Sequence, residues 1–266
     1  MDVRDTQIAD SWVGVVGSGP PLIVIHGGPG LEHGYLLPWL LPLADKHTLY
    51  FYDQRGCGRD RTPPGKVTVA ALHGQLETIA RALSDKGSLS LFAHSWGAYL
   101  VYELVNRMRD IEIEAFIALS PIGLTRERFR ASGERIVSRV PEEVIEGLPE
   151  LAGRGDDGRS VMEALAPFYQ ADPTNPVDVH FRSYREEVYQ QIDGHLEAFD
   201  YRDIGPTLPA KTLLLYGDQD VELPEETSEV HPFVRVRTLE QCGHFGFAER
   251  TGDFLGAMRT FLSNGT

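Results

Sequence analysis

A serine, an aspartate and a histidine occur along the chain in an order and in contexts that suit nucleophilic catalysis. Ser95 lies between an apolar run at residues 89–93 and a helical pattern at residues 98–108. This is the strand–turn–helix context of an exposed catalytic serine. The local pattern is Ala-x-Ser-x-Gly, with Ala93 where glycine is usual. Taken alone, the pattern also fits an ordinary strand–helix turn that contains a serine.

An acid and a base follow Ser95 in the order that such a serine needs. A serine hydroxyl is inert at neutral pH unless a base takes its proton and an acid orients that base. Asp220 ends a Gly-x-x-Asp turn after an apolar strand pattern, and His244 lies in a Gln-Cys-Gly-His-Phe loop after the next one. Asp218 of the same turn is the alternative acid. We therefore predict a catalytic triad of Ser95, Asp220 and His244.

A glycine-rich segment supplies the third requirement of such chemistry. His26-Gly-Gly-Pro-Gly30 follows an apolar strand pattern, and glycines let main-chain N–H groups approach a developing oxyanion. We assign the oxyanion donors to the N–H groups of Gly28 and Trp96, and we place Gly27 against the substrate. The segment does not match a phosphate-binding motif. A turn that only joins a strand to a helix is the structural alternative.

The elements that position these residues alternate between strands and helices. A helical pattern begins behind Thr68, a suitable N-cap, and two more helices are expected at residues 98–108 and 253–262. The alternation predicts an α/β fold with a mostly parallel, doubly wound sheet. The predicted strands are residues 11–16, 22–25, 48–52, 89–93, 115–119, 212–216 and 233–239.

This alternation stops in the middle of the chain. Residues 122–205 show helical segments punctuated by proline and glycine, without a convincing strand pattern. We therefore predict an α/β core of residues 1–121 and 206–266, with residues 122–205 inserted as a helical cap.

Composition and charge narrow the possible partners and compartments. The chain has 266 residues, and its net charge of -14 disfavours contact with nucleic acid or an anionic membrane. It shows no apolar run long enough to span a bilayer, and the charged N-terminus predicts a cytoplasmic protein. The two cysteines lack Cys-x-x-Cys spacing, so we do not expect a structural zinc site. The oligomeric state is left open.

Taken together, the motifs resemble the proline iminopeptidase branch of the α/β-hydrolases. The resemblance rests on His26–Gly30, on Asp53-Gln-Arg-Gly-Cys-Gly-Arg59, and on Ser95, Asp220 and His244. It covers the core and becomes vague across the cap. It implies an α/β-hydrolase fold, a Ser–His–Asp mechanism without a cofactor or metal, and small peptide or amide substrates with a free N-terminal residue, often proline.

The same resemblance implies acidic side chains near the cap that hold the free amine of the substrate. Tyr184-Arg-Glu-Glu187 resembles the branch's aromatic-x-x-aromatic-Glu stretch, so Glu186 is the first candidate for this contact and Glu187 the second. Both also fit a solvated helix face. Arg55 is a candidate support of the oxyanion loop through Asp53, with a surface salt bridge as the alternative.

Two other functions stay open. The short cap and the substitution at Ala93 leave room for an esterase or lactonase with the same triad, which would not need Glu186 or Glu187. A protein of this fold that binds a small ligand without turnover is the second alternative, although a complete set of catalytic residues argues against it.

Overall fold

A single eight-stranded sheet forms the centre of the molecule. The computed structural model describes residues 2–196, 198–222 and 234–263. The strand order is β1-β2-β4-β3-β5-β6-β7-β8; β2 pairs antiparallel with both β1 and β4, and the remaining pairs are parallel. The strands are β1 (Arg4–Ile8), β2 (Ser11–Gly17), β3 (Pro21–Ile25), β4 (Thr48–Tyr52), β5 (Leu89–His94), β6 (Ile113–Leu119), β7 (Lys211–Gly217) and β8 (Arg235–Leu239).

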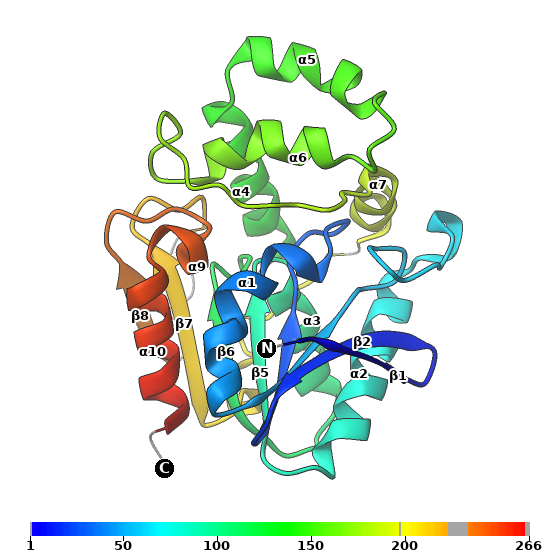
Figure 1. The fold of residues 1–266 in the computed structure, drawn as a ribbon, viewed down its shortest axis with the longest axis vertical. Coiled ribbons are helices and arrows are strands. Elements are labelled where there is room, and N and C mark those ends of the chain that lie inside the picture. Colours follow the sequence, from blue (N-terminus) through cyan, green and yellow to red (C-terminus); the bar gives the residue numbers. More distant parts are fainter. Residues whose placement is uncertain (1, 197, 223–233, 264–266) are drawn as a thin grey trace.

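Helices cover both faces of this sheet (Figure 1). Successive side chains of a strand point to opposite faces, so Ile23 and Ile25 pack with α2 and α3, whereas Leu22 and Val24 pack with α1 and α10. The doubly wound, mostly parallel sheet predicted from the sequence is confirmed. The helices are α1 (Leu37–Leu40), α2 (Val69–Ser84), α3 (Gly97–Arg107), α4 (Arg126–Arg139), α5 (Glu142–Ala152), α6 (Arg159–Leu165), α7 (Glu186–His195), α9 (Gly246–Glu249) and α10 (Thr251–Ser263).

Most predicted elements lie within two residues of their observed bounds. The Thr68 side chain accepts a hydrogen bond from the N–H of Ala71, so the predicted N-cap of α2 is confirmed. Strand β1 was not predicted, because Arg4–Ile8 is mostly polar and exposed and pairs only with β2 at the edge of the sheet. The last predicted strand began at Phe233, which lies outside the described residues.

The segment between β6 and β7 leaves the sheet. Its described residues form α4 to α7, which lie together above one end of the sheet in Figure 1. Several hydrogen bonds join this segment to the core at the loops that carry the predicted acid and base. Among them, Arg135 of α4 donates to the carbonyl of Val221 at 2.6 Å, and the N–H of His244 donates to the carbonyl of Tyr169 at 2.8 Å.

Candidate active site

Ser95 lies at a sharp turn between β5 and α3. Its φ of 52° is in the left-handed region, which a residue other than glycine adopts only when its surroundings hold it there. The N–H of Ser95 donates to the carbonyl of Leu119 at 3.0 Å, and this bond fixes the turn against β6. Ser95 is half-buried although its neighbours on both sides are buried. The turn thus presents one hydroxyl at the end of the central strand.

The glycine that follows this turn is required by close packing. A Cβ atom on Gly97 would lie 2.7 Å from the carbonyl oxygen of Ile25 and 2.8 Å from that of His26, closer than real Cβ atoms come. Ala93 has no such conflict, because it lies inside β5 with an ordinary strand conformation and pairs with Ile25 and Ala118. The departure from the usual glycine is therefore compatible with the local backbone.

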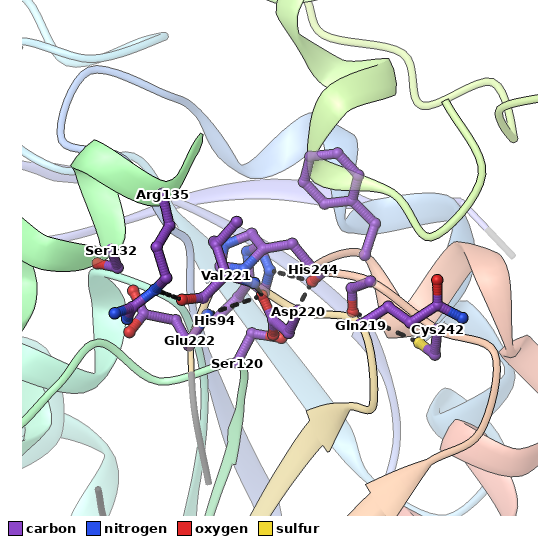
Figure 2. A network of polar contacts seen from close by, with 12 residues as sticks. His94, Ser120, Ser132, Arg135, Gln219, Asp220, Val221, Glu222, Cys242 and His244 are labelled. Atoms are coloured by element: carbon purple, nitrogen blue, oxygen red, sulfur yellow. Dashed lines mark hydrogen bonds and ion pairs between the residues drawn. The ribbon is translucent and has the colours of Figure 1, made fainter. Parts of the chain in front are cut away.

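Asp220 and His244 form a buried hydrogen-bonded pair (Figure 2). Nδ1 of His244 lies 2.8 Å from Oδ1 of Asp220, and their side chains are 5% and 0% exposed. The same Oδ1 accepts main-chain N–H groups from Val221 at 2.6 Å and from Glu222 at 3.2 Å. Burial by itself raises the pKa of Asp220, but His244 outweighs it as a charge and as a hydrogen-bond partner, so the pKa is lowered. Asp220 is therefore ionised at neutral pH.

The alternative acid, Asp218, has a different environment. Its carboxylate is exposed and accepts the N–H of Cys242 at 3.0 Å. It thus holds the backbone of the His244 loop rather than the imidazole. The geometry favours Asp220 as the partner of His244.

The two candidate oxyanion donors lie in separate loops. None of the hydrogen bonds among the described residues uses the main-chain N–H of Gly28 or Trp96, so both donors are available. The N–H of Gly27, by contrast, donates to the hydroxyl of Tyr35 at 2.7 Å. Gly27 is buried against protein, whereas Gly28 is half-buried.

Gln54 joins these two loops. Its side-chain oxygen accepts the indole N–H of Trp96 at 3.1 Å, and its Nε2 donates to the carbonyl of His26 at 2.7 Å. The N–H of Gln54 also donates to Nε2 of His26 at 3.0 Å, which requires that nitrogen to be unprotonated. Burial lowers the pKa of His26 to about 4, which agrees with a neutral ring. The sequence signal for Gln54 was its place in the second motif, but no role was predicted for it.

Of the two interpretations of Arg55, support of the oxyanion loop through Asp53 is wrong, and salt bridges are found instead. Arg55 pairs with Asp60 at 2.9 Å and with Asp10 at 2.6 Å, not with Asp53. Asp53 instead accepts Nδ1 of His33 at 2.7 Å and the N–H of Arg59 at 2.8 Å. The reason is that two other carboxylates lie within reach of Arg55: Asp10, in the turn between β1 and β2, and Asp60, five residues further along the chain.

One group of described residues has the types that bind metals. Glu32, His33 and Asp53 are buried, with one potential ligand atom each within 4.8 Å of the others. Their lone pairs are engaged within the protein, because Asp53 binds His33 and Glu32 accepts the N–H groups of Gly34 and Arg182. These hydrogen bonds give the cluster a structural role, because Glu32 joins the core to the segment between β6 and β7 through Arg182.

Comparison with known proteins agrees with this architecture. A model of the alpha/beta hydrolase family matches residues 22–257. The chain belongs to the α/β-hydrolase family. A proline iminopeptidase of Saccharolobus solfataricus is 37% identical over 275 residues, covering 93% of this hydrolase and 86% of the relative. The hydrolase is accordingly an enzyme that resembles the proline iminopeptidases, as its motifs predicted.

Solved structures show the same fold with different activities. A proline iminopeptidase of Mycobacterium smegmatis superposes with a TM-score of 0.70 at 22% identity, covering 98% of this hydrolase and 97% of that chain. An esterase of Exiguobacterium antarcticum superposes with a TM-score of 0.71 at 18% identity, covering 99% and 100%. Identities this low establish the fold alone. Within the described residues, no helix is both long and apolar enough to cross a membrane.

The candidate amine-binding residues of the hydrolase are paired with neighbours in their own segment. Glu186 and Glu187 are exposed at the start of α7, where Glu186 accepts the side-chain N–H of Gln190 at 2.9 Å and Glu187 that of Arg185 at 3.4 Å. Glu222, which sequence reasoning missed, is a buried carboxylate two residues beyond Asp220. Figure 2 shows it beside Asp220 and Arg135.

Proposed function

We propose that this hydrolase releases the N-terminal residue, often proline, from small peptides or aminoacyl amides through an acyl-enzyme. The observation that carries the proposal is the buried Asp220–His244 pair, whose histidine contacts His94, the residue that precedes Ser95. The 37% identical proline iminopeptidase supports the substrate class.

In the proposed reaction, Oγ of Ser95 attacks the carbonyl carbon and its proton passes to Nε2 of His244. The oxygen that becomes negative is held by the N–H groups of Gly28 and Trp96. The carbon–nitrogen bond then breaks, and the leaving amine takes the proton from His244. Water attacks the acyl-enzyme next, gives its proton to His244, and the acid is released as Ser95 regains that proton. Asp220 stays ionised throughout and stabilises the imidazolium.

A substrate with a free amine brings a positive charge that needs a carboxylate when it is desolvated. Glu186, Glu187 and Glu222 are the candidates, the first two by resemblance and the third by its burial near Asp220. The Glu→Gln variants at these positions keep the side-chain size and remove the charge. The residue that binds the amine is the one whose variant loses activity on proline p-nitroanilide but keeps activity on p-nitrophenyl acetate.

An esterase or lactonase with the same triad is the second candidate. It is favoured by the exposure of Glu186 and Glu187, which are paired with their own neighbours in α7 and before it. Such an enzyme would cleave p-nitrophenyl acetate and N-acetylproline p-nitroanilide without any need for a free amine.

The test is a paired assay of the purified protein on proline p-nitroanilide, its N-acetylated counterpart and p-nitrophenyl acetate. Cleavage of the free-amine anilide alone supports the exopeptidase, whereas rapid ester cleavage without anilide turnover supports the esterase. Ser95→Ala should abolish each activity and leave the thermal midpoint nearly unchanged. A fluorophosphonate probe that fails to label Ser95 would instead support a ligand-binding protein without turnover.

A further inference from the structure

A chain of hydrogen bonds links the oxyanion loop to the histidine loop through the residue that precedes Ser95. The N–H of Gly27 donates to the hydroxyl of Tyr35 at 2.7 Å, and that hydroxyl lies 2.8 Å from Nδ1 of His94. Nε2 of His94 then lies 3.1 Å from the carbonyl oxygen of His244. All four residues are buried.

The donors and acceptors fix the direction of this chain. A carbonyl oxygen only accepts, so Nε2 of His94 must carry the proton that it shares with His244. A neutral ring then leaves Nδ1 as an acceptor, and it takes the single proton of the Tyr35 hydroxyl. The hydroxyl oxygen is thereby free to accept the N–H of Gly27. Burial and the nearby His244 lower the pKa of His94 to about 3, in agreement with this neutral tautomer.

This chain of hydrogen bonds reaches the three segments that carry the proposed oxyanion donor, nucleophile and base. Gly27 precedes the oxyanion donor Gly28, His94 precedes the nucleophile Ser95, and His244 is itself the proposed base. Packing at Gly27 is tight as well: a Cβ atom there would lie 2.9 Å from the Tyr35 hydroxyl and 3.1 Å from Nδ1 of His94. A shift in this chain therefore moves a donor, the nucleophile or the base relative to the other two.

We infer that Tyr35 and His94 are positioning residues that set the relative placement of the oxyanion loop, Ser95 and the His244 loop. The inference rests on the proposed triad, but it does not depend on whether the substrate is an amide or an ester. Neither residue touches the substrate in this role. Removal of the Tyr35 hydroxyl should therefore reduce the rate of the chemical steps more than the binding of substrate.

Tyr52 provides a matched control for Tyr35. It is also a fully buried tyrosine of the core, and its hydroxyl has no hydrogen-bond partner among the described residues. Tyr35→Phe and Tyr52→Phe thus remove the same atom from similar surroundings, but only the first breaks the chain. Both variants keep the aromatic ring, so the packing is preserved.

The experiment compares kcat and KM of the two variants and of the unmodified protein on p-nitrophenyl acetate and proline p-nitroanilide, well below each thermal midpoint. We expect Tyr35→Phe to lower kcat about 10- to 100-fold with KM changed less than about threefold, which is the scale of a displaced oxyanion donor or nucleophile. Tyr52→Phe should stay within about twofold of the unmodified protein. Equal kcat values for the two variants, or a loss confined to KM, would overturn the inference.

A double-mutant cycle tests whether Tyr35 and His94 act as one unit. His94→Gln can place an amide N–H near the former Nε2 while it removes the acceptor of the Tyr35 hydroxyl. If the chain acts as a unit, Tyr35→Phe combined with His94→Gln loses little more kcat than the worse single variant. Multiplicative losses would show two independent effects and contradict the inference. Ser95→Ala separates the two levels: activity retained by this variant refutes the triad, whereas an inactive Ser95→Ala with equal Tyr→Phe variants refutes only the positioning role.

Discussion

Replacement of Asp220 by asparagine tests the electrostatic part of the site. Oδ1 of Asp220 accepts His244 and also two main-chain N–H groups, from Val221 and Glu222. An asparagine side chain is therefore held with its oxygen at the same place and its amide nitrogen at the position of Oδ2. The hydrogen bond to Nδ1 of His244 persists, and the change removes a negative charge with little change in geometry.

The distance gives the scale of the expected loss. An imidazolium and a carboxylate 2.8 Å apart attract each other by about 6 kcal/mol if the effective dielectric constant is about 20. This attraction is present only while His244 carries the proton, so it stabilises the transition state and not the resting enzyme. Because the hydrogen bond to the neutral amide recovers part of it, we expect kcat to fall by about 10³- to 10⁴-fold.

The assay is the hydrolysis of p-nitrophenyl acetate, with Asp218→Asn as the matched control. Asp218 is an exposed carboxylate in the same turn, and an asparagine there can still accept the N–H of Cys242, so its kcat should change less than about threefold. Thermal midpoints of both variants show whether the fold is intact. A kcat above about a tenth of the original in Asp220→Asn, or a larger loss in Asp218→Asn, would refute the electrostatic reasoning.

Three further substitutions, one of them with a matched control, probe the supports of the site. Gln54→Leu should lower kcat on p-nitrophenyl acetate about tenfold, because it removes the hydrogen bonds that join Trp96 to His26. The control is Gln75→Leu, which breaks hydrogen bonds to Ser11 and to the main chain at Asp53 and Arg55. This control should lower the thermal midpoint without the loss of kcat. Asp53→Asn should reduce the free energy of unfolding by about 3 kcal/mol at neutral pH. Burial opposes ionisation of Asp53, but His33 lowers its pKa below the ordinary 3.8. The difference in free energy of unfolding between the two proteins should therefore be largest above pH 3.8 and shrink as the pH falls through the folded-state pKa. Urea unfolding at several pH values measures it. Gly97→Ala should cost about 1–3 kcal/mol in the same measurement, because its methyl group would meet the carbonyls of Ile25 and His26; an unchanged midpoint would contradict this packing.

The strands and turns that carry the candidate site were predictable because their signals are local. Ser95, Asp220 and His244 each lie in the loop or turn that follows a strand, and the carboxyl ends of parallel strands meet at one edge of a sheet. The choice between Asp218 and Asp220 needed only their place in a short turn, since the turn buries one carboxylate and exposes the other. The predicted contact between Asp220 and His244 is present in the structure, with 2.8 Å between Oδ1 and Nδ1.

The supports of the site were not predictable, because they arise from contacts between distant segments. Tyr35 and His94 are 59 residues apart, and His94 and His244 are 150 apart. A tyrosine in a loop or a histidine in an apolar strand carries no signal of such a partner in a single sequence. The sequence left two interpretations of Glu186 and Glu187 open, and the solvated helix face is the one that the structure shows; the register of a helix against its neighbours depends on residues far away in the chain.

The two most specific motifs of the sequence serve one structural purpose. Gln54 binds His26 of the first motif, and a Cβ on Gly58 of the second would lie 2.5 Å from the Asp53 carboxylate. The second motif thus folds tightly around Asp53 and supports the loop that carries Gly28. Since both motifs shape the proposed oxyanion loop, their presence favours acyl chemistry without deciding between an amide and an ester. That decision depends on the carboxylates near the cap, which is why the free-amine and acetylated substrates must be compared in the same preparation.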